Sequence, residues 1–244
     1  MKSAVFLIIA IALQSEARVF NMGESKFSGY ISGTYGSSAI KKSFFEGESS
    51  ATDYSKGFDT NMGGDFGFLY RSGYVSWIFG FEFIKPTKIT GGVASTGGTQ
   101  NYKYETDISI FAPKIGLELI LYQTKDFRVF INGAVGTASV TTKTNYTELS
   151  IAPNGDFSLD GKGSGSLISS GLGFEWHWND NTTVVFQASY RDLKFSKVEY
   201  SEDEASSFQG AQTSGTTMTL LDGSNRKLNL TGYYSLIGLR FWLF

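Results

Sequence analysis

The stretch Tyr74-Val-Ser-Trp-Ile-Phe-Gly-Phe-Glu-Phe83 decides the fold. Its odd-numbered positions are all apolar and mostly aromatic, whereas its even-numbered positions are mixed and include the carboxylate of Glu82. Side chains alternate between the two faces of a β-strand, so this pattern predicts a strand with one continuous apolar face. A helix would scatter the same apolar residues around its circumference. The apolar positions are Val75, Trp77, Phe79, Phe81 and Phe83.

Similar alternation recurs about eight times along the chain, and the connections between the segments are alternately long and short. Antiparallel neighbours place successive connections at opposite ends, so the four long ones fall on one side. The sequence therefore predicts one all-β domain, a transmembrane eight-stranded antiparallel up-and-down β-barrel with four long extracellular loops. The alternative is a ten-stranded barrel, in which residues 217–221 pair with another loop segment. The expected strands are residues 27–35, 64–70, 74–83, 106–122, 127–135, 167–178, 183–195 and 228–244.

The fourth expected strand changes the phase of its apolar residues partway along. Ile108 and Ile110 occupy even positions, and Pro113 separates them from a set at odd positions. That set is Ile115, Leu117, Leu119 and Leu121. Proline has no N–H to donate to a sheet ladder and is found at bulges. We interpret the change of phase as a β-bulge at Pro113.

The first 17 residues have the pattern of a secretory signal peptide. Lys2 precedes a ten-residue apolar run, and Ser15-Glu16-Ala17 fits a small-x-small cleavage site. No apolar run approaches the roughly 20 residues of a spanning helix. We expect residues 1–17 to be a leader and residues 18–244 to form the barrel domain, which places the protein in the outer membrane.

Composition excludes several classes of function. A net charge of −2 provides no electrostatic basis for binding nucleic acid, and the absence of Cys removes disulfides and thiolate metal ligands. We expect no cofactor and no resident metal. A closed barrel in lipid supplies the stability that an exported chain without disulfides needs.

Alternation alone does not say which face of the barrel is outside, and a soluble ligand-binding barrel would bury its apolar face. Three features favour a lipid-facing apolar exterior: charged residues share faces with many glycines, tryptophans lie on the apolar face near a short turn, and the connection lengths are asymmetric. The expected lipid-facing aromatic belt includes Trp77, Phe79, Phe81, Trp176 and Trp178. The expected interior charge network is Asp65, Glu82, Glu118, Arg128, Glu175, Arg191 and Arg240.

The leader, the eight strands, the segment Gly-Leu-Arg-Phe at 238–241 and the terminal Phe244 resemble small Gram-negative outer-membrane barrels of the OmpA, OmpX and OmpW kinds. The resemblance covers the whole mature chain but is generic to these families. It implies a monomer in contact with outer-membrane lipids and lipopolysaccharide, and a terminal strand read by the outer-membrane assembly machinery. Arg240 and Trp242 share one face of that strand, and we expect Arg240 to point inward.

The interior of an eight-stranded barrel is just wide enough for side chains to fill it. Buried charges must pair, so the favoured interpretation is a salt-bridge network that plugs the barrel. The alternative is a gated, porin-like path for small or apolar solutes.

His177 is the only histidine. The resemblance includes lipid A deacylases, lipid-modifying barrels that use His with Ser and Glu at the outer leaflet. Here His177 adjoins the short turn at the opposite, periplasmic end, so we do not expect an enzyme.

The long loops are the remaining candidate for function, because recognition commonly resides on loops held by a rigid scaffold. They carry aromatic and apolar residues among charges, and we expect an extracellular ligand there. The acidic residues from Glu199 to Glu204 are a weak candidate for divalent cations that bridge lipopolysaccharide. The apolar residues are Phe44, Phe45, Tyr102, Tyr104, Tyr146, Phe208, Met218, Leu220 and Leu221.

Overall fold

The computed structural model describes residues 24–38, 40, 44, 59–94, 100–147, 155–179, 181–204, 210–219 and 223–243. The predicted leader, Phe244, Phe45, Phe208, Leu220 and Leu221 lie outside these ranges. The strands are β1 (Phe27–Ser38), β2 (Asp59–Ser72), β3 (Val75–Pro86), β4 (Ile89–Ala94), β5 (Gln100–Gln123), β6 (Phe127–Thr147), β7 (Phe157–Asn179), β8 (Thr182–Phe195), β9 (Glu199–Tyr200), β10 (Leu228–Asn229) and β11 (Gly232–Leu243).

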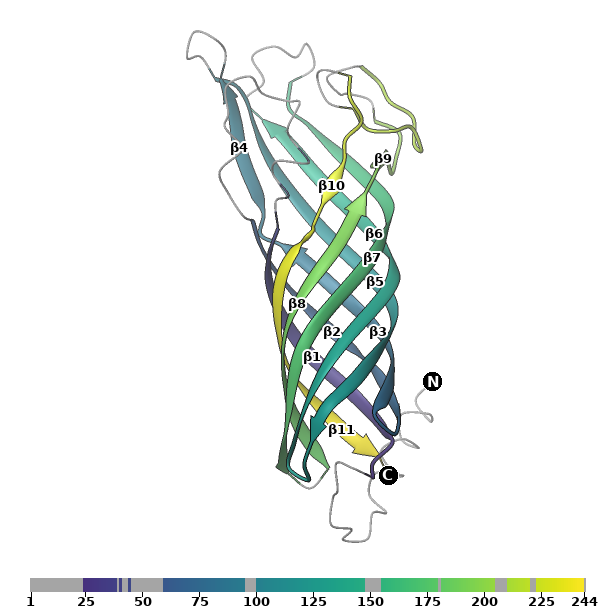
Figure 1. The fold of residues 1–244 in the computed structure, drawn as a ribbon. Coiled ribbons are helices and arrows are strands. Elements are labelled where there is room, and N and C mark those ends of the chain that lie inside the picture. Colours follow the sequence, from purple (N-terminus) through teal and green to yellow (C-terminus); the bar gives the residue numbers. More distant parts are fainter. Residues whose placement is uncertain are drawn as a thin grey trace, which may run out of the picture.

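Eight of these strands close into a ring, which confirms the predicted barrel (Figure 1). Every neighbour in the ring is antiparallel, and β11 closes it by pairing with β1 on one side and β8 on the other. The ring order is β1, β2, β3, β5, β6, β7, β8 and β11. The short strands β4, β9 and β10 pair with its members without entering it. Thr217 makes only an isolated bridge with Glu199, so the ten-stranded alternative is wrong.

The short connections lie at one end of the barrel together with both ends of the ring-forming chain (Figure 1). We call this the turn end and the opposite one the loop end. A two-residue turn joins β2 to β3, where Gly73 has a φ of 63°, a conformation that favours glycine. Within the described residues, no helix combines the length and apolar character needed to cross a bilayer.

At the loop end the strands run much further than the alternation in the sequence predicts. β6 and β7 pair continuously as far as Tyr146 opposite Phe157, and β5 continues to Gln100. The segment between the expected strands 127–135 and 167–178 therefore extends β6 to Thr147 and begins β7 at Phe157. We use the name loop-end sheet for the strands on the loop-end side of the level of Phe111. It consists of β4, β9 and the parts of β5, β6 and β7 above that level.

The expected bulge at Pro113 is wrong. β5 pairs with β3 in an unbroken register from Ile110 to Leu119, with Pro113 opposite Phe81, and its register shift lies instead between Ile120 and Tyr122 against β6. Even-numbered residues point inward from Tyr102 to Ile120. The apolar residues change phase because the barrel interior itself is apolar at the loop end and polar at the turn end.

Candidate functional site

Two clusters of ion pairs fill the turn-end half of the barrel. The lower ion cluster consists of Glu118, Arg128, Glu175 and Arg240 from β5, β6, β7 and β11. Arg128 Nη2 lies 2.6 Å from Glu175 Oε2, and Arg240 Nη1 lies 2.7 Å from the same oxygen. Arg240 also forms a bidentate pair with both oxygens of Glu118. All four side chains are buried, so this pairing is what makes their burial tolerable.

Aromatic and hydroxyl groups complete the lower ion cluster. The indole of Trp242 donates to Glu175 Oε1 at 3.0 Å and lies 4.9 Å from the guanidinium carbon of Arg128. Thr183 donates to the same carboxylate oxygen. The ring of Phe130 has room because Gly173 faces it across the sheet, where a Cβ atom would lie 2.2 Å from the ring.

The upper ion cluster consists of Asp65, Glu82, Lys114 and Arg191 from β2, β3, β5 and β8. Lys114 Nζ lies 2.6 Å from Asp65 and 3.2 Å from Glu82, whose other oxygen accepts from Arg191 at 2.6 Å. Arg191 also donates to Asn61 at 3.0 Å. Each cluster contains two carboxylates and two cations, so each is neutral by itself.

All seven residues of the expected interior network lie buried inside the barrel, but they divide into the two clusters and do not form one chain. The sequence analysis missed Lys114, the fourth cation. A count of inward charges would have found it, since four expected carboxylates faced only three guanidiniums. It also missed two further interior side chains. One is Trp242, a partner of Glu175, and the other is Arg71, which lies near the end of β2, points inward and donates to Gln123.

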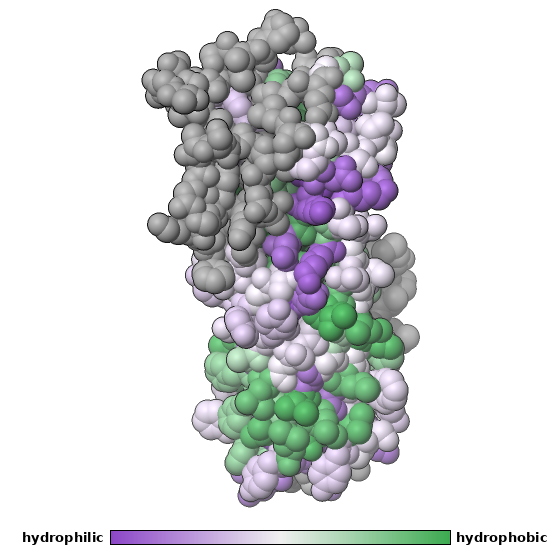
Figure 2. All heavy atoms as spheres, turned by 45° about the horizontal axis from the view of Figure 1, so that its top comes forward, coloured by the Kyte–Doolittle hydropathy of each residue, from purple (hydrophilic) through white to green (hydrophobic). Residues whose placement is uncertain are grey.

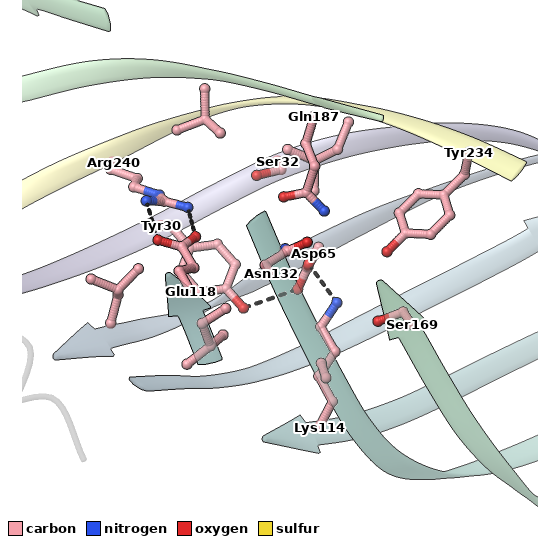
Figure 3. Close-up of a pocket in the computed structure, with 15 residues that line it drawn as sticks. Tyr30, Ser32, Asp65, Lys114, Glu118, Asn132, Ser169, Gln187, Tyr234 and Arg240 are labelled. Atoms are coloured by element: carbon pink, nitrogen blue, oxygen red, sulfur yellow. Dashed lines mark hydrogen bonds and ion pairs between the residues drawn. The ribbon is translucent and has the colours of Figure 1, made fainter. Parts of the chain in front are cut away.

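A small cavity separates the two clusters (Figure 3). Tyr30 donates to Asp65 at 3.1 Å on one side, and the Arg240–Glu118 pair closes the other. The cavity measures about 30 Å³, which has room for about two water molecules. At this level the barrel has no space for a solute.

The interior of the loop end is an apolar core. It combines inward residues of the strands with side chains from the long connections, including Ile40, Phe44 and Met218, all fully buried. The guanidinium of Arg226 enters this core, where it lies 4.7 Å from the centre of the Phe44 ring and donates to the hydroxyl of Tyr146 at 3.0 Å. Side chains from the β1–β2 and β8–β11 connections therefore meet inside the mouth of the barrel.

The exterior of the turn-end half is apolar around the ring. Outward side chains there are exposed Phe, Ile, Leu, Val, Tyr and Trp, and hydrophobic residues gather in the lower half of Figure 2. The five expected belt residues all point outward and are 40–67% exposed. A closed ring with an apolar exterior, aromatic rims and a charged interior matches a bilayer and no aqueous setting. The chain is an outer-membrane β-barrel. Its turn end is accordingly periplasmic and its loop end extracellular.

Three solved structures illustrate what this chain is similar to. Neisserial surface protein A matches at 10% identity over 89% of this chain and 97% of that chain, with a TM-score of 0.47. Ail, the attachment invasion locus protein of Yersinia pestis, matches at 10% identity over 89% and 98%, with a TM-score of 0.46. The outer membrane protease OmpT from Escherichia coli matches at 10% identity over 94% and 100%, with a TM-score of 0.44. No family model and no curated protein matches the sequence.

His177 lies on β7 near the periplasmic turn, half-buried and opposite Thr183, as expected from the sequence. Among the residues that the structure describes, no group of three or more His, Asp and Glu side chains is arranged to hold a metal ion. Two of the acidic residues after Glu199 instead accept backbone hydrogen bonds within the protein: Glu204 from the Asp160 amide and Asp203 from the Ser214 amide.

The exterior of the loop-end sheet is polar and carries paired charges. Lys88 Nζ lies 2.6 Å from Glu105, and this hydrogen bond raises the pKa of Lys88 above its ordinary value. Lys197 lies 2.6 Å from Glu199, and its hydrogen bond lowers the pKa of that carboxyl. These groups are exposed, so the pairs add little to the stability of the fold.

Proposed function

We propose that this protein is a non-conducting, non-enzymatic barrel that presents its loop-end sheet and loops to extracellular partners. One observation supports the proposal: the interior is filled at three successive levels, by the lower ion cluster, the upper ion cluster and the apolar core. With the interior closed, the extracellular surface is what remains for contact with other molecules. The proposed partners are an extracellular ligand at the loops, outer-membrane lipids and the assembly machinery, and the proposed state is a monomer.

The closed interior is tested by conductance. The purified mature protein, inserted into a planar lipid bilayer, is expected to show no steady ion current above background. Steady single-channel steps would overturn this half of the proposal and favour the porin-like alternative. Replacement of Arg240 by Ala provides the comparison, because it removes one of the two cations that join Glu118 to Glu175 and is expected to allow brief openings.

The surface role is tested by shortening one loop without disturbing the core. The Tyr200 amide already donates a backbone hydrogen bond of 2.9 Å to the Thr216 carbonyl, so Asn-Gly in place of residues 201–215 closes a two-residue hairpin. Met218 remains in the apolar core. Cells that carry the shortened protein are expected to bind less well to plates coated with laminin or fibronectin than cells with the full protein. Equal binding, with equal amounts at the surface, would overturn the role of this loop.

A further inference from the structure

The ring closes where β1 meets β11, at a junction that no turn or loop spans. Every other junction joins ring strands that follow one another in the chain, whereas β1 and β11 are the first and the last. We call the β1–β11 junction the seam. Its pairing ends at Gly36, opposite Tyr234, while β6 and β7 pair as far as Tyr146. The seam is therefore short and depends on noncovalent contacts alone.

Two residues that stand directly opposite each other across the seam are both connected to β5. Arg240 on β11 stands opposite Tyr30 on β1. Arg240 Nη1 donates across the lumen to Glu118 Oε2 on β5 at 3.0 Å. Tyr30 donates to Asp65, which also accepts from Lys114, four residues before Glu118 on β5. Figure 3 shows both connections, so one strand holds the two sides of the seam.

A second ion pair crosses the lumen in the upper ion cluster. Arg191 on β8 lies 2.6 Å from Glu82 on β3. The strands β8 and β3 are four places apart in the ring of eight, as are β11 and β5, so each pair joins opposite walls. We use the name crossing pairs for Arg191–Glu82 and Arg240–Glu118. Both have the cation on one of the last two strands of the ring and the carboxylate in its first half.

The crossing pairs depend on closure of the ring. Neighbouring strands lie about 4.8 Å apart, so strands four places apart in a flat, open sheet would be about 19 Å apart. Arginine and glutamate side chains do not meet over that distance, and they meet here because the sheet is closed into a narrow cylinder. Breaking a buried ion pair is strongly destabilising. Opening of the seam is therefore opposed by both pairs.

We propose that the crossing pairs form a closure lock, which keeps the seam paired by holding the last two strands of the ring to the opposite wall. The connection through Tyr30, Asp65 and Lys114 holds the first strand to the same wall. This role differs from that of a plug. A plug requires side chains that fill the interior, whereas a lock requires ion pairs that run across it.

Hydrogen exchange of backbone amides, measured by NMR on the refolded mature protein in detergent micelles, tests the lock, because local opening sets the exchange rate. The variant Glu118→Gln removes one crossing pair and leaves Arg240 with Glu175, two places away in the ring. Glu175→Gln is the matched control. It removes an equally buried carboxylate from the same cluster, and its partners lie within two places in the ring.

We expect Glu118→Gln to accelerate exchange in β1 and β11 about tenfold or more beyond any acceleration in β6 and β7. Glu175→Gln should affect β6 and β7 at least as much as the seam, because its pair with Arg128 joins those two strands.

A disulfide across the seam separates loss of the lock from a general loss of stability. The chain has no Cys, and Tyr35 stands directly opposite Ser235 on the outer face of the seam. Tyr35→Cys/Ser235→Cys is expected to return the seam exchange of Glu118→Gln to that of the parent. The control disulfide Ile131→Cys/Leu172→Cys, which joins β6 to β7, is expected not to. If Glu118→Gln does not refold by itself, the seam disulfide should restore refolding and the control disulfide should not.

Three results would overturn the lock. They are equal acceleration at the seam and at the β6–β7 junction, no acceleration in Glu118→Gln, and the same response of that variant to both disulfides. None of these results depends on ion conductance or on binding by the loops.

Discussion

The two halves of this barrel are chemically inverted although the same strands run through both. In the periplasmic half, aromatic and aliphatic side chains point outward while carboxylates and cations point inward. In the extracellular half, Lys and Asp point outward while Ile, Leu and Tyr form a dry core. β5 passes from one half to the other without a change in its inward parity.

The inversion shows that the surroundings, and not the strand, decide which face is apolar. A side chain beside lipid is stable when apolar, and one beside water is stable when polar. In each half the interior has the opposite composition to the outer wall. Paired ions fill the periplasmic half, whose outer wall is apolar, and packed hydrocarbon side chains fill the extracellular half, whose outer wall is polar.

The largest expected effect comes from unbalancing the lower ion cluster. Glu175→Ala leaves Arg128 and Arg240 with only Glu118 as a carboxylate partner, and breaking a buried pair in this way costs about 3–5 kcal/mol. We expect urea unfolding from lipid vesicles to show this loss. Glu105→Ala, which breaks an exposed pair on the extracellular sheet, should change stability little. Similar losses in the two variants would contradict the distinction between the halves.

A cavity in the apolar core is expected to cost nearly as much. Ile110 is 2% exposed inside the extracellular half, and Ile110→Ala should destabilise by about 2–5 kcal/mol. Ile115 lies five residues further along β5 but faces lipid, whose chains refill the vacated space. Ile115→Ala should therefore lose clearly less in the same urea titration. The reverse order would mean that the parity of β5 is misassigned.

A charge on the outer wall distinguishes the halves directly. Phe79→Arg places a guanidinium in the apolar belt, where it costs about 2–4 kcal/mol, whereas Ser164→Arg on the exposed face of β7 beyond the belt costs about 0–1 kcal/mol. Unfolding from vesicles of phosphatidylcholine measures both. Equal costs would mean that the membrane reaches beyond the belt proposed here.

The smallest effect is a dependence on pH at the exposed Lys197–Glu199 pair. The pKa of Glu199 is lowered in the folded protein, so its small contribution is present above the ordinary carboxyl pKa and is lost as the pH falls through the lowered value. Carboxyl chemical shifts should show this midpoint below that of a model peptide. In Lys197→Gln the midpoint should return toward the ordinary range, and an unchanged midpoint would exclude this cause.

Much of the membrane half follows from the sequence. Residues 74–83 alternate because one face meets lipid and the other meets the small or charged interior. Period two gives the two faces, and the charges, the tryptophans and the asymmetry of the connections place Trp77 and Phe79 outside. The seven interior charges were found because they lie on the face opposite the apolar side chains, in several strands beside glycines. The division into two neutral clusters was not predictable from the sequence, since it depends on the stagger between strands that are distant in the chain, as in the contact of Arg191 with Glu82.

The extracellular half was predicted poorly for a physical reason. Its strands continue without an apolar exterior, so the outward residues of β6 and β7, including Thr141, Lys143 and Lys162, have the composition of a loop. The change at Pro113 was the available signal. It marked the level at which the surroundings of the barrel change from lipid to water. Because we interpreted it as a β-bulge in one strand, we did not recognise that boundary or the neighbouring Lys114.

The length of β5 beyond Phe111 has a consequence for access to the cell from outside. The strand continues for eleven residues to Gln100, which at ~3.3 Å per residue and a tilt of about 40° raises the tips roughly 25–30 Å above the hydrocarbon. The wall at its base stands among neighbouring glycolipids, while the tips stand clear of their inner sugars. Antibodies and phages that approach an intact bacterium therefore meet the tips of the long strands first, and the neighbouring glycolipids screen the wall at their base.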